Sequence, residues 1–480
     1  MLKIFFKNNL TYTVGNILTR GIAFLLLPIF TRYLSPEEFG VIDLFMVLAA
    51  IINITITLEI SQGIARYFQE SKNVKEKREY TSSAFWFTIL VYLLFFIISF
   101  IFRDKFTLLL LEDDGKKTIF LLAVFSIVTN GIFYFTQNQL KWQIQPRDSV
   151  IASFFSILIL VFVTLYLLIF HGLNLESIFI GQIIGNIFGS IISILYARKS
   201  YGFIFSIIKF KKMISYSSPL VLSSIGIFIA IYIDRIAIKD LLGFEKLGIY
   251  GVAYRFAAIA GLLIIGFQQS LTPLIFKNYK KKKTPKDISE IFNIFIIFAL
   301  IIVAASILFA NELVIFFTTK AFYNSADLIT LLIIIIFFSN MYIFAPGISI
   351  AKKTKLIPII SISVAILNFI LNYTLIPIFG LKGAAYASLL SVLIGFAIYM
   401  YISNYFYPIP YKYKKQIISF IFMLIISYSL INFLNEINLI SFIVKISYLL
   451  ILFISIASLL LEKKHKNKIK INIINLYSKN

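Results

Sequence analysis

Residues 331–338 read Leu-Leu-Ile-Ile-Ile-Ile-Phe-Phe, an unbroken apolar run inside a longer apolar segment at 325–346. A strand of an outer-membrane barrel would alternate apolar and polar side chains over about ten residues, and this run does not alternate. A segment that crosses lipid as a helix satisfies its own backbone polar groups. We therefore predict that this segment is a membrane-spanning helix.

The composition extends this prediction to the whole chain. Of the 480 residues, 60% are hydrophobic and 14% are charged, against about 25% charged in a soluble domain. A spanning helix takes about 20 apolar residues, so the chain has room for about fourteen. We predict an all-α integral membrane protein with spans near residues 10–31, 41–65, 82–102, 118–138, 149–170, 176–196, 213–234, 247–276, 288–309, 325–346, 356–377, 383–403, 416–434 and 440–460.

The basic residues of the loops support this count. With the N-terminus inside, the predicted cytoplasmic segments hold 32 of the 45 Lys and Arg residues, the outer loops hold 10, and three lie within spans. An excess of positive charge in short cytoplasmic loops is typical of inner-membrane proteins, and a wrong span count would destroy it. We therefore predict a multi-pass membrane protein with both termini cytoplasmic.

The same count explains the net charge of +23. On a soluble chain, such an excess would suggest nucleic-acid binding. Here the excess falls on the predicted cytoplasmic face, so we expect contact with membrane lipids and no nucleic-acid partner.

Two short segments resemble each other at a shift of 208 residues. Residues 34–41 read LSPEEFGV and residues 242–249 read LGFEKLGI. Each copy lies between the first and second helix of a six-helix set, which predicts a parallel repeat about an axis along the membrane normal. We predict lobes at 1–198 and 199–405, followed by two appended helices and a basic cytoplasmic tail at 406–480. Residues Ser35, Pro36 and Glu38 also have the pattern of a helix N-terminus, which offers a local explanation of the first copy.

Polar residues within the spans mark candidate sites, because such groups are costly in lipid. The predicted cargo-binding residues are Asn16, Arg20, Asn53, Gln137, Asn186 and Arg255. One interpretation places them around a central cavity, where a guanidinium suits phosphate. The other is that Asn and Gln side chains form hydrogen bonds between helices.

The acidic residues Glu59, Asp43 and Asp234 are candidates for coupling transport to H⁺ or Na⁺. Glu59 could instead pair with an arginine, and exposed helix ends equally explain Asp43 and Asp234. Lys445 lies near an outer helix end and is expected to extend its ammonium group to the interface.

Several classes of function lack their sequence signals. The chain contains no cysteine, only two histidines, and no nucleotide-binding P-loop or hydrolase motif. We therefore expect no metal, no cofactor and no catalytic activity. The short loops also leave no room for a separate catalytic domain.

The segments 16–20, 31–41 and 65–67, together with Asp234-Arg235, 247–250 and 253–255, resemble polysaccharide flippases of the Wzx type. These belong to the multidrug/oligosaccharidyl-lipid/polysaccharide superfamily. The resemblance implies a location in the bacterial cytoplasmic (inner) membrane and two six-helix lobes around a cavity with alternating access. It also implies an undecaprenyl-pyrophosphate-linked oligosaccharide cargo, such as an O-antigen unit of lipopolysaccharide, and a polymerase and chain-length regulator as partners.

Two other hypotheses stay open. An ion-coupled drug or lipid-precursor exporter of the same superfamily would favour acidic cavity residues. A membrane polysaccharide polymerase or ligase would be expected to carry a large outer loop with catalytic residues.

Overall fold

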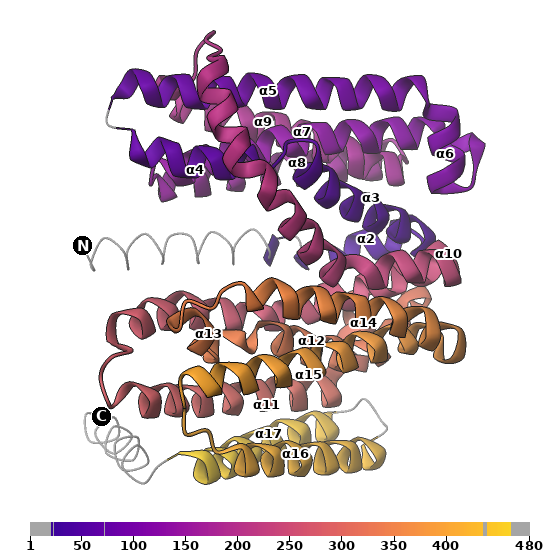
Figure 1. Ribbon diagram of the computed structural model, residues 1–480. Coiled ribbons are helices and arrows are strands. Elements are labelled where there is room, and N and C mark those ends of the chain that lie inside the picture. The colour runs from indigo at the N-terminus through magenta and orange to yellow at the C-terminus, as the bar shows by residue number, and fades with distance from the viewer. Residues whose placement is uncertain (1–20, 23, 72, 435–438, 462–480) are drawn as a thin grey trace, which may run out of the picture. The chain divides into compact units, whose positions relative to one another are not determined.

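The computed structural model describes residues 21–22, 24–71, 73–434 and 439–461, and these contain helices and no strand (Figure 1). The α-helices are α2 (Leu27–Tyr33), α3 (Pro36–Thr55), α4 (Ile60–Glu70), α5 (Val74–Ile101), α6 (Arg103–Leu111), α7 (Lys117–Trp142), α8 (Pro146–Phe170), α9 (Leu175–Tyr196), α10 (Ile207–Asn278), α11 (Thr284–Phe317), α12 (Ala326–Asn340), α13 (Gly347–Ile350), α14 (Leu356–Phe379), α15 (Leu381–Phe406), α16 (Tyr413–Phe433) and α17 (Leu439–Leu460). Short 3₁₀ turns are η1 (Asp114–Lys116), η2 (Arg198–Ser200), η3 (Lys320–Ser325) and η4 (Met341–Phe344).

The predicted all-helical membrane fold is confirmed. Within the described residues, 12 helical segments are long and apolar enough to cross a membrane. Helix α10 accounts for two predicted spans, because its backbone leaves the helical conformation at Gly243. The first predicted span, 10–31, lies mostly outside the described residues, so the prediction of about fourteen is consistent with the fold.

The chain forms two compact units. The first comprises Met1–Gly251 and Ala365–Ala384, and the second comprises Val252–Val364 and Ala385–Asn480. Helix α10 contributes to both units, since the division falls at residue 251. The lobes predicted at 1–198 and 199–405 were drawn from the sequence repeat, whereas these units reflect how densely the residues pack. The lobe boundaries therefore stay a prediction.

Within the first unit, α9 packs closely against α7 and α8 (Figure 1). Gly181, Gly185 and Gly189 occupy this interface, where an added Cβ would overlap Thr164, the Ser156 carbonyl or Phe133. Small residues at four-residue spacing let membrane helices approach closely. The three glycines therefore set how tightly α9 packs.

Within the second unit, α11 is the central helix and contacts α12, α16 and α17. Its core is aromatic: the Phe295 ring meets the Phe337 ring edge-on at 5.9 Å between centroids and lies 5.1 Å from Phe344. Edge-to-face aromatic pairs add to the stabilisation from burial.

Lys445 links the appended helix α17 to α11 within this unit. Its ammonium group donates to Glu312 on α11 and lies 5.4 Å from the centre of the Phe309 ring, and the residue is 3% exposed. The expectation that Lys445 extends to the interface is therefore wrong. A carboxylate on the neighbouring helix satisfies the charge inside the protein, an alternative that the position of the residue in its span did not indicate.

Candidate functional site

The second predicted span, 41–65, is interrupted in the middle. Helix α3 ends at Thr55 and α4 begins at Ile60, and between them Leu58 and Glu59 have φ values of 50° and 51°. Left-handed backbone costs a non-glycine residue about 1–2 kcal/mol. Such strain persists only where the surrounding structure enforces it, so the break requires support from other helices.

Two serines of α10 supply that support. The Ser217 hydroxyl donates to the Leu58 carbonyl at 2.7 Å, and the Ser224 hydroxyl donates to Glu59 Oε1 at 2.7 Å. The first bond satisfies a carbonyl that the interrupted helix leaves free, and the second holds a half-buried carboxylate. The predicted coupling residue Glu59 therefore lies at a helix break and not on a regular helix face.

Three of the predicted cargo-binding residues form hydrogen bonds between helices. Asn53 donates to Asn130 Oδ1 at 3.3 Å and accepts from the Tyr92 hydroxyl. Gln137 of α7 donates to a hydroxyl of α8, that of Ser153. Asn186 of α9 lies 3.5 Å from Thr129 Oγ1 on α7. These contacts are those expected of polar groups that join helices, and the role of the three residues toward cargo stays a prediction.

Asp234 is buried, although an exposed helix end was an equal explanation from the sequence. Its carboxylate accepts from the Arg235 backbone N–H at 2.8 Å, lies 3.4 Å from the Arg235 guanidinium and accepts from the Tyr250 hydroxyl. Removing one partner of a buried pair leaves an uncompensated charge. Arg235 and Tyr250 were not predicted as partners of Asp234, although the adjacent Asp-Arg pair is visible in the sequence.

The two copies of the repeat contact each other reciprocally. A Cβ on Gly40 would overlap the Phe244 carbonyl, and a Cβ on Gly248 would overlap the Pro36 carbonyl. Gly40 and Gly248 are 208 residues apart, as are Pro36 and Phe244, so each contact is the image of the other. Reciprocal contact of this kind is the mark of two-fold symmetry. It supports the parallel repeat that the sequence indicates.

The symmetry extends to how each helix begins. Ser35, just before α3, accepts from the Glu38 N–H at 3.2 Å, and Glu38 Oε2 accepts from the Ser35 N–H at 2.8 Å. Gly243, 208 residues later, holds the break in α10 with φ 82° and ψ −179°. A helix therefore starts at the same point in each copy of the repeat. In the first copy it starts after the capping residue Ser35, and in the second after Gly243.

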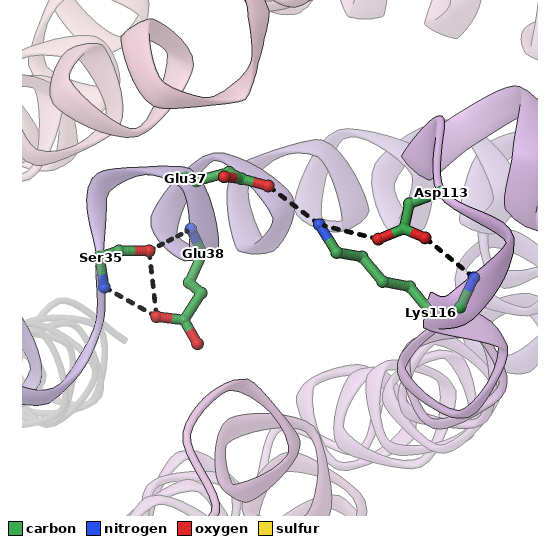
Figure 2. A network of polar contacts seen from close by, with 6 residues as sticks. Ser35, Glu37, Glu38, Asp113 and Lys116 are labelled. Atoms are coloured by element: carbon green, nitrogen blue, oxygen red, sulfur yellow. Dashed lines mark hydrogen bonds and ion pairs between the residues drawn. The ribbon is translucent and has the colours of Figure 1, made fainter.

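The start of α3 is also anchored by charge, as Figure 2 shows. Lys116 Nζ lies 2.9 Å from Glu37 Oε1 and 3.7 Å from Asp113 Oδ2.

Asp43, one helical turn further along α3 than Phe39, is buried, and its carboxylate lies where a Cβ on Gly251 would be. The exposed position considered for Asp43 is therefore not observed.

The remaining predicted cargo-binding residues are Arg255, Asn16 and Arg20. Arg255 is half-buried on α10 in the second unit. Asn16 and Arg20 lie outside the described residues. The predicted meeting of Arg20 and Arg255 at one cavity stays a prediction.

Comparison with known proteins identifies the family. Residues 5–279 match the family described as "Polysaccharide biosynthesis protein", which is more than half of the chain. The chain belongs to this family. Residues 219–374 of this polysaccharide biosynthesis family protein also match the MatE family. The resemblance drawn from the sequence motifs is thereby confirmed at the level of the family.

The individual proteins to which this polysaccharide biosynthesis family member is similar share only 22–27% sequence identity with it in the two cases that follow. The chain is 27% identical over 281 residues to "Capsular polysaccharide biosynthesis protein CapF" of Staphylococcus aureus, covering 56% of this chain and 65% of CapF, just under two thirds of that protein. It is 22% identical over 397 residues to "Putative O-antigen transporter" of Shigella flexneri, covering 79% and 93% of the two chains.

Among solved structures, the lipid II flippase MurJ in an inward closed conformation is similar in fold. The TM-score is 0.72 at 17% identity, and the match covers 93% of this chain and 98% of that one. At this identity the likeness establishes the fold, a multi-pass helical membrane protein, and no more.

Proposed function

We propose that this protein is a flippase that moves undecaprenyl-pyrophosphate-linked oligosaccharide from the cytoplasmic to the outer leaflet during surface polysaccharide biosynthesis. The observation that carries the proposal is the family match over residues 5–279. The names of the capsular and O-antigen relatives agree with it. The family and the fold are those of transporters and not of enzymes.

In this proposal the two lobes expose the cargo site to one face at a time. The reciprocal packing at Gly40 and Gly248 supports an arrangement in which the repeat copies close one face by direct backbone contact. Two packed elements related by symmetry provide a contact that can open and close as a unit.

The predicted roles of the binding residues follow from their chemistry. Arg20 and Arg255 would attract the pyrophosphate, and Asn16, Asn53, Gln137 and Asn186 would bind sugar hydroxyls. The test is to measure the amount of surface polysaccharide in cells that carry Arg20→Ala or Arg20→Lys at equal protein levels. We expect export to fall at least tenfold with Ala and to recover in part with Lys. Undiminished export in the Ala variant would remove Arg20 from the mechanism.

Energy would come from coupling to H⁺ or Na⁺ at Glu59, Asp43 or Asp234. Glu59 is the strongest of the three, because its half-buried carboxylate lies at a helix break held by Ser224. A Glu59→Gln variant keeps the shape and removes the charge. We expect its transport in vesicles to become insensitive to the imposed ion gradient, while Glu59→Asp keeps that dependence.

The match of residues 219–374 to the MatE family favours a second candidate, ion-coupled export of drugs or other lipid precursors. Deletion of the gene separates the two. Loss of surface polysaccharide with unchanged drug sensitivity supports the flippase, and the reverse result supports the exporter.

For either function we propose a cytoplasmic-membrane location with both termini inside. For the flippase, a polymerase and a chain-length regulator would act as partners.

A further inference from the structure

An open pocket of about 740 Å³ in the first unit lies where the start of α5 meets the segment after α9. Lys75 and Arg78 reach it from the first turns of α5, and Arg198 and Lys199 from η2. Val74 and Ile204 complete the lining. These residues belong to the two segments, 66–80 and 197–212, that the loop charges place on the cytoplasmic face.

The pocket carries four positive charges and no carboxylate in its lining. Among the described residues, no ion pair involves any of these four side chains. The neighbouring Glu76 is engaged elsewhere, by Lys209 Nζ at 2.8 Å. That contact also raises the pKa of Lys209 above its ordinary value. The four cations therefore remain available to an external anion.

The walls of the pocket are held in place by hydrogen bonds. Arg78 Nε donates to the Tyr201 carbonyl at 3.0 Å, and Trp86 Nε1 donates to the Gly202 carbonyl at 2.9 Å. The Ser206 N–H donates to the Ser83 hydroxyl at 2.8 Å. These three bonds fix the segment 201–206 against α5, so the basic side chains of both walls start from ordered backbone.

Apolar surface continues from this charged pocket. Phe203 is 94% exposed beside Trp86, their ring centroids being 5.3 Å apart. Further along α5, the exposed Leu90, Leu94 and Ile98 follow one another at four-residue spacing and so lie on one face. A charged pocket at the end of an exposed apolar helix face suits a molecule with an anionic head and hydrocarbon chains.

We propose that this pocket binds the phosphate headgroup of an anionic bilayer phospholipid, with the acyl chains lying along the exposed face of α5 and Phe203 in the interface. None of the predicted cargo-binding residues that the structure describes lines this pocket, which supports a bilayer phospholipid and not the proposed cargo as its occupant. The site is independent of what the protein transports.

The test uses the full-length protein in nanodiscs of phosphatidylcholine containing a small fraction of phosphatidylglycerol, with native mass spectrometry to count retained phosphatidylglycerol. The variant is Arg198→Gln with Lys199→Gln, because Arg78 also holds the backbone of the loop. Each basic residue near an anionic surface contributes about a fivefold factor in affinity. We expect at least a tenfold weaker retention in the double variant.

The matched control is Lys280→Gln with Lys282→Gln, which removes the same charge from exposed positions after α10. Selective loss in the first variant alone supports the proposal, provided that its elution volume and melting temperature are unchanged. A single Lys199→Gln variant replaces it if folding fails. An equal loss of phosphatidylglycerol in the control variant overturns the proposal. Displacement of the lipid by glycerol phosphate alone also overturns it, as does a lipid-linked pyrophosphate that occupies the pocket in preference to phosphatidylglycerol.

Discussion

The first unit contains two helix interruptions that arise by opposite means. At Gly243 the backbone takes φ 82° and ψ −179°, a conformation that is essentially restricted to glycine, and nothing lies within 4 Å of an added Cβ. At Leu58 and Glu59 the backbone is left-handed in two bulky residues, and Ser217 and Ser224 hold it from another helix. The first interruption is a property of its residue, and the second is a property of its surroundings. Substitutions should therefore act on backbone freedom in one case and on tertiary contacts in the other.

The largest expected effect is at the crossing that follows the glycine break. In Gly248→Val the added side chain would meet the Pro36 carbonyl, and overpacking of this kind costs about 1–3 kcal/mol or more. We expect a strongly lowered melting temperature of the purified protein. Gly261→Ala is the control, since its Cβ would have an ordinary contact 3.5 Å from Ile336. Equal stability of the Val variant would show that the crossing is not tightly packed.

An intermediate effect is expected from Gly243→Ala. The methyl group meets no atom, so the whole cost is backbone strain of about 1–3 kcal/mol in a conformation essentially restricted to glycine. The measurement is again thermal unfolding in detergent, beside the same Gly261→Ala control. A melting temperature equal to that of the parent would mean that the break at Gly243 is not enforced by glycine geometry.

The smallest effect is expected from Ser217→Ala, which removes one hydrogen bond to the Leu58 carbonyl and costs about 1 kcal/mol. Because the break depends on this contact, faster hydrogen exchange is expected at residues 55–60 and not along the rest of α3. Ser455→Ala is the control, because that exposed hydroxyl bonds only to a carbonyl of its own helix. Uniform exchange in both variants would contradict tertiary support of the break.

The contrast between these regions also shows what could be predicted from the sequence. The spans and the repeat were predictable because apolar length and motif shift are local properties of the chain. The capped start of α3 was predictable for the same reason, since Ser35 and Glu38 are three residues apart. The break at Glu59 was not predicted, because the span was placed by its overall apolar length, although Asn53, Thr55, Thr57 and Glu59 alternate with apolar residues over 52–60. Its serine partners lie more than 150 residues away.

The candidate site divides in the same way. Six candidate residues were recognisable from the sequence as polar groups in apolar segments: Asn53, Gln137, Asn186, Asp43, Asp234 and Glu59. Their partners were not recognisable, because a hydrogen bond between helices depends on which faces meet. Lys445 is the clearest case: its position suggested the interface, and the neighbouring Glu312 keeps it inside.

By itself, the sequence determined the helical membrane fold, the approximate number of spans and the doubled motif. Lipid leaves the backbone few alternatives, and apolar length alone decides which segments cross it. Only the tertiary structure decided that the two motif copies pack glycine against carbonyl in reciprocal fashion. It also decided that the second span breaks at Glu59. Both depend on close approach of residues far apart in the chain, and a few ångströms of helix position are enough to create or remove such contacts.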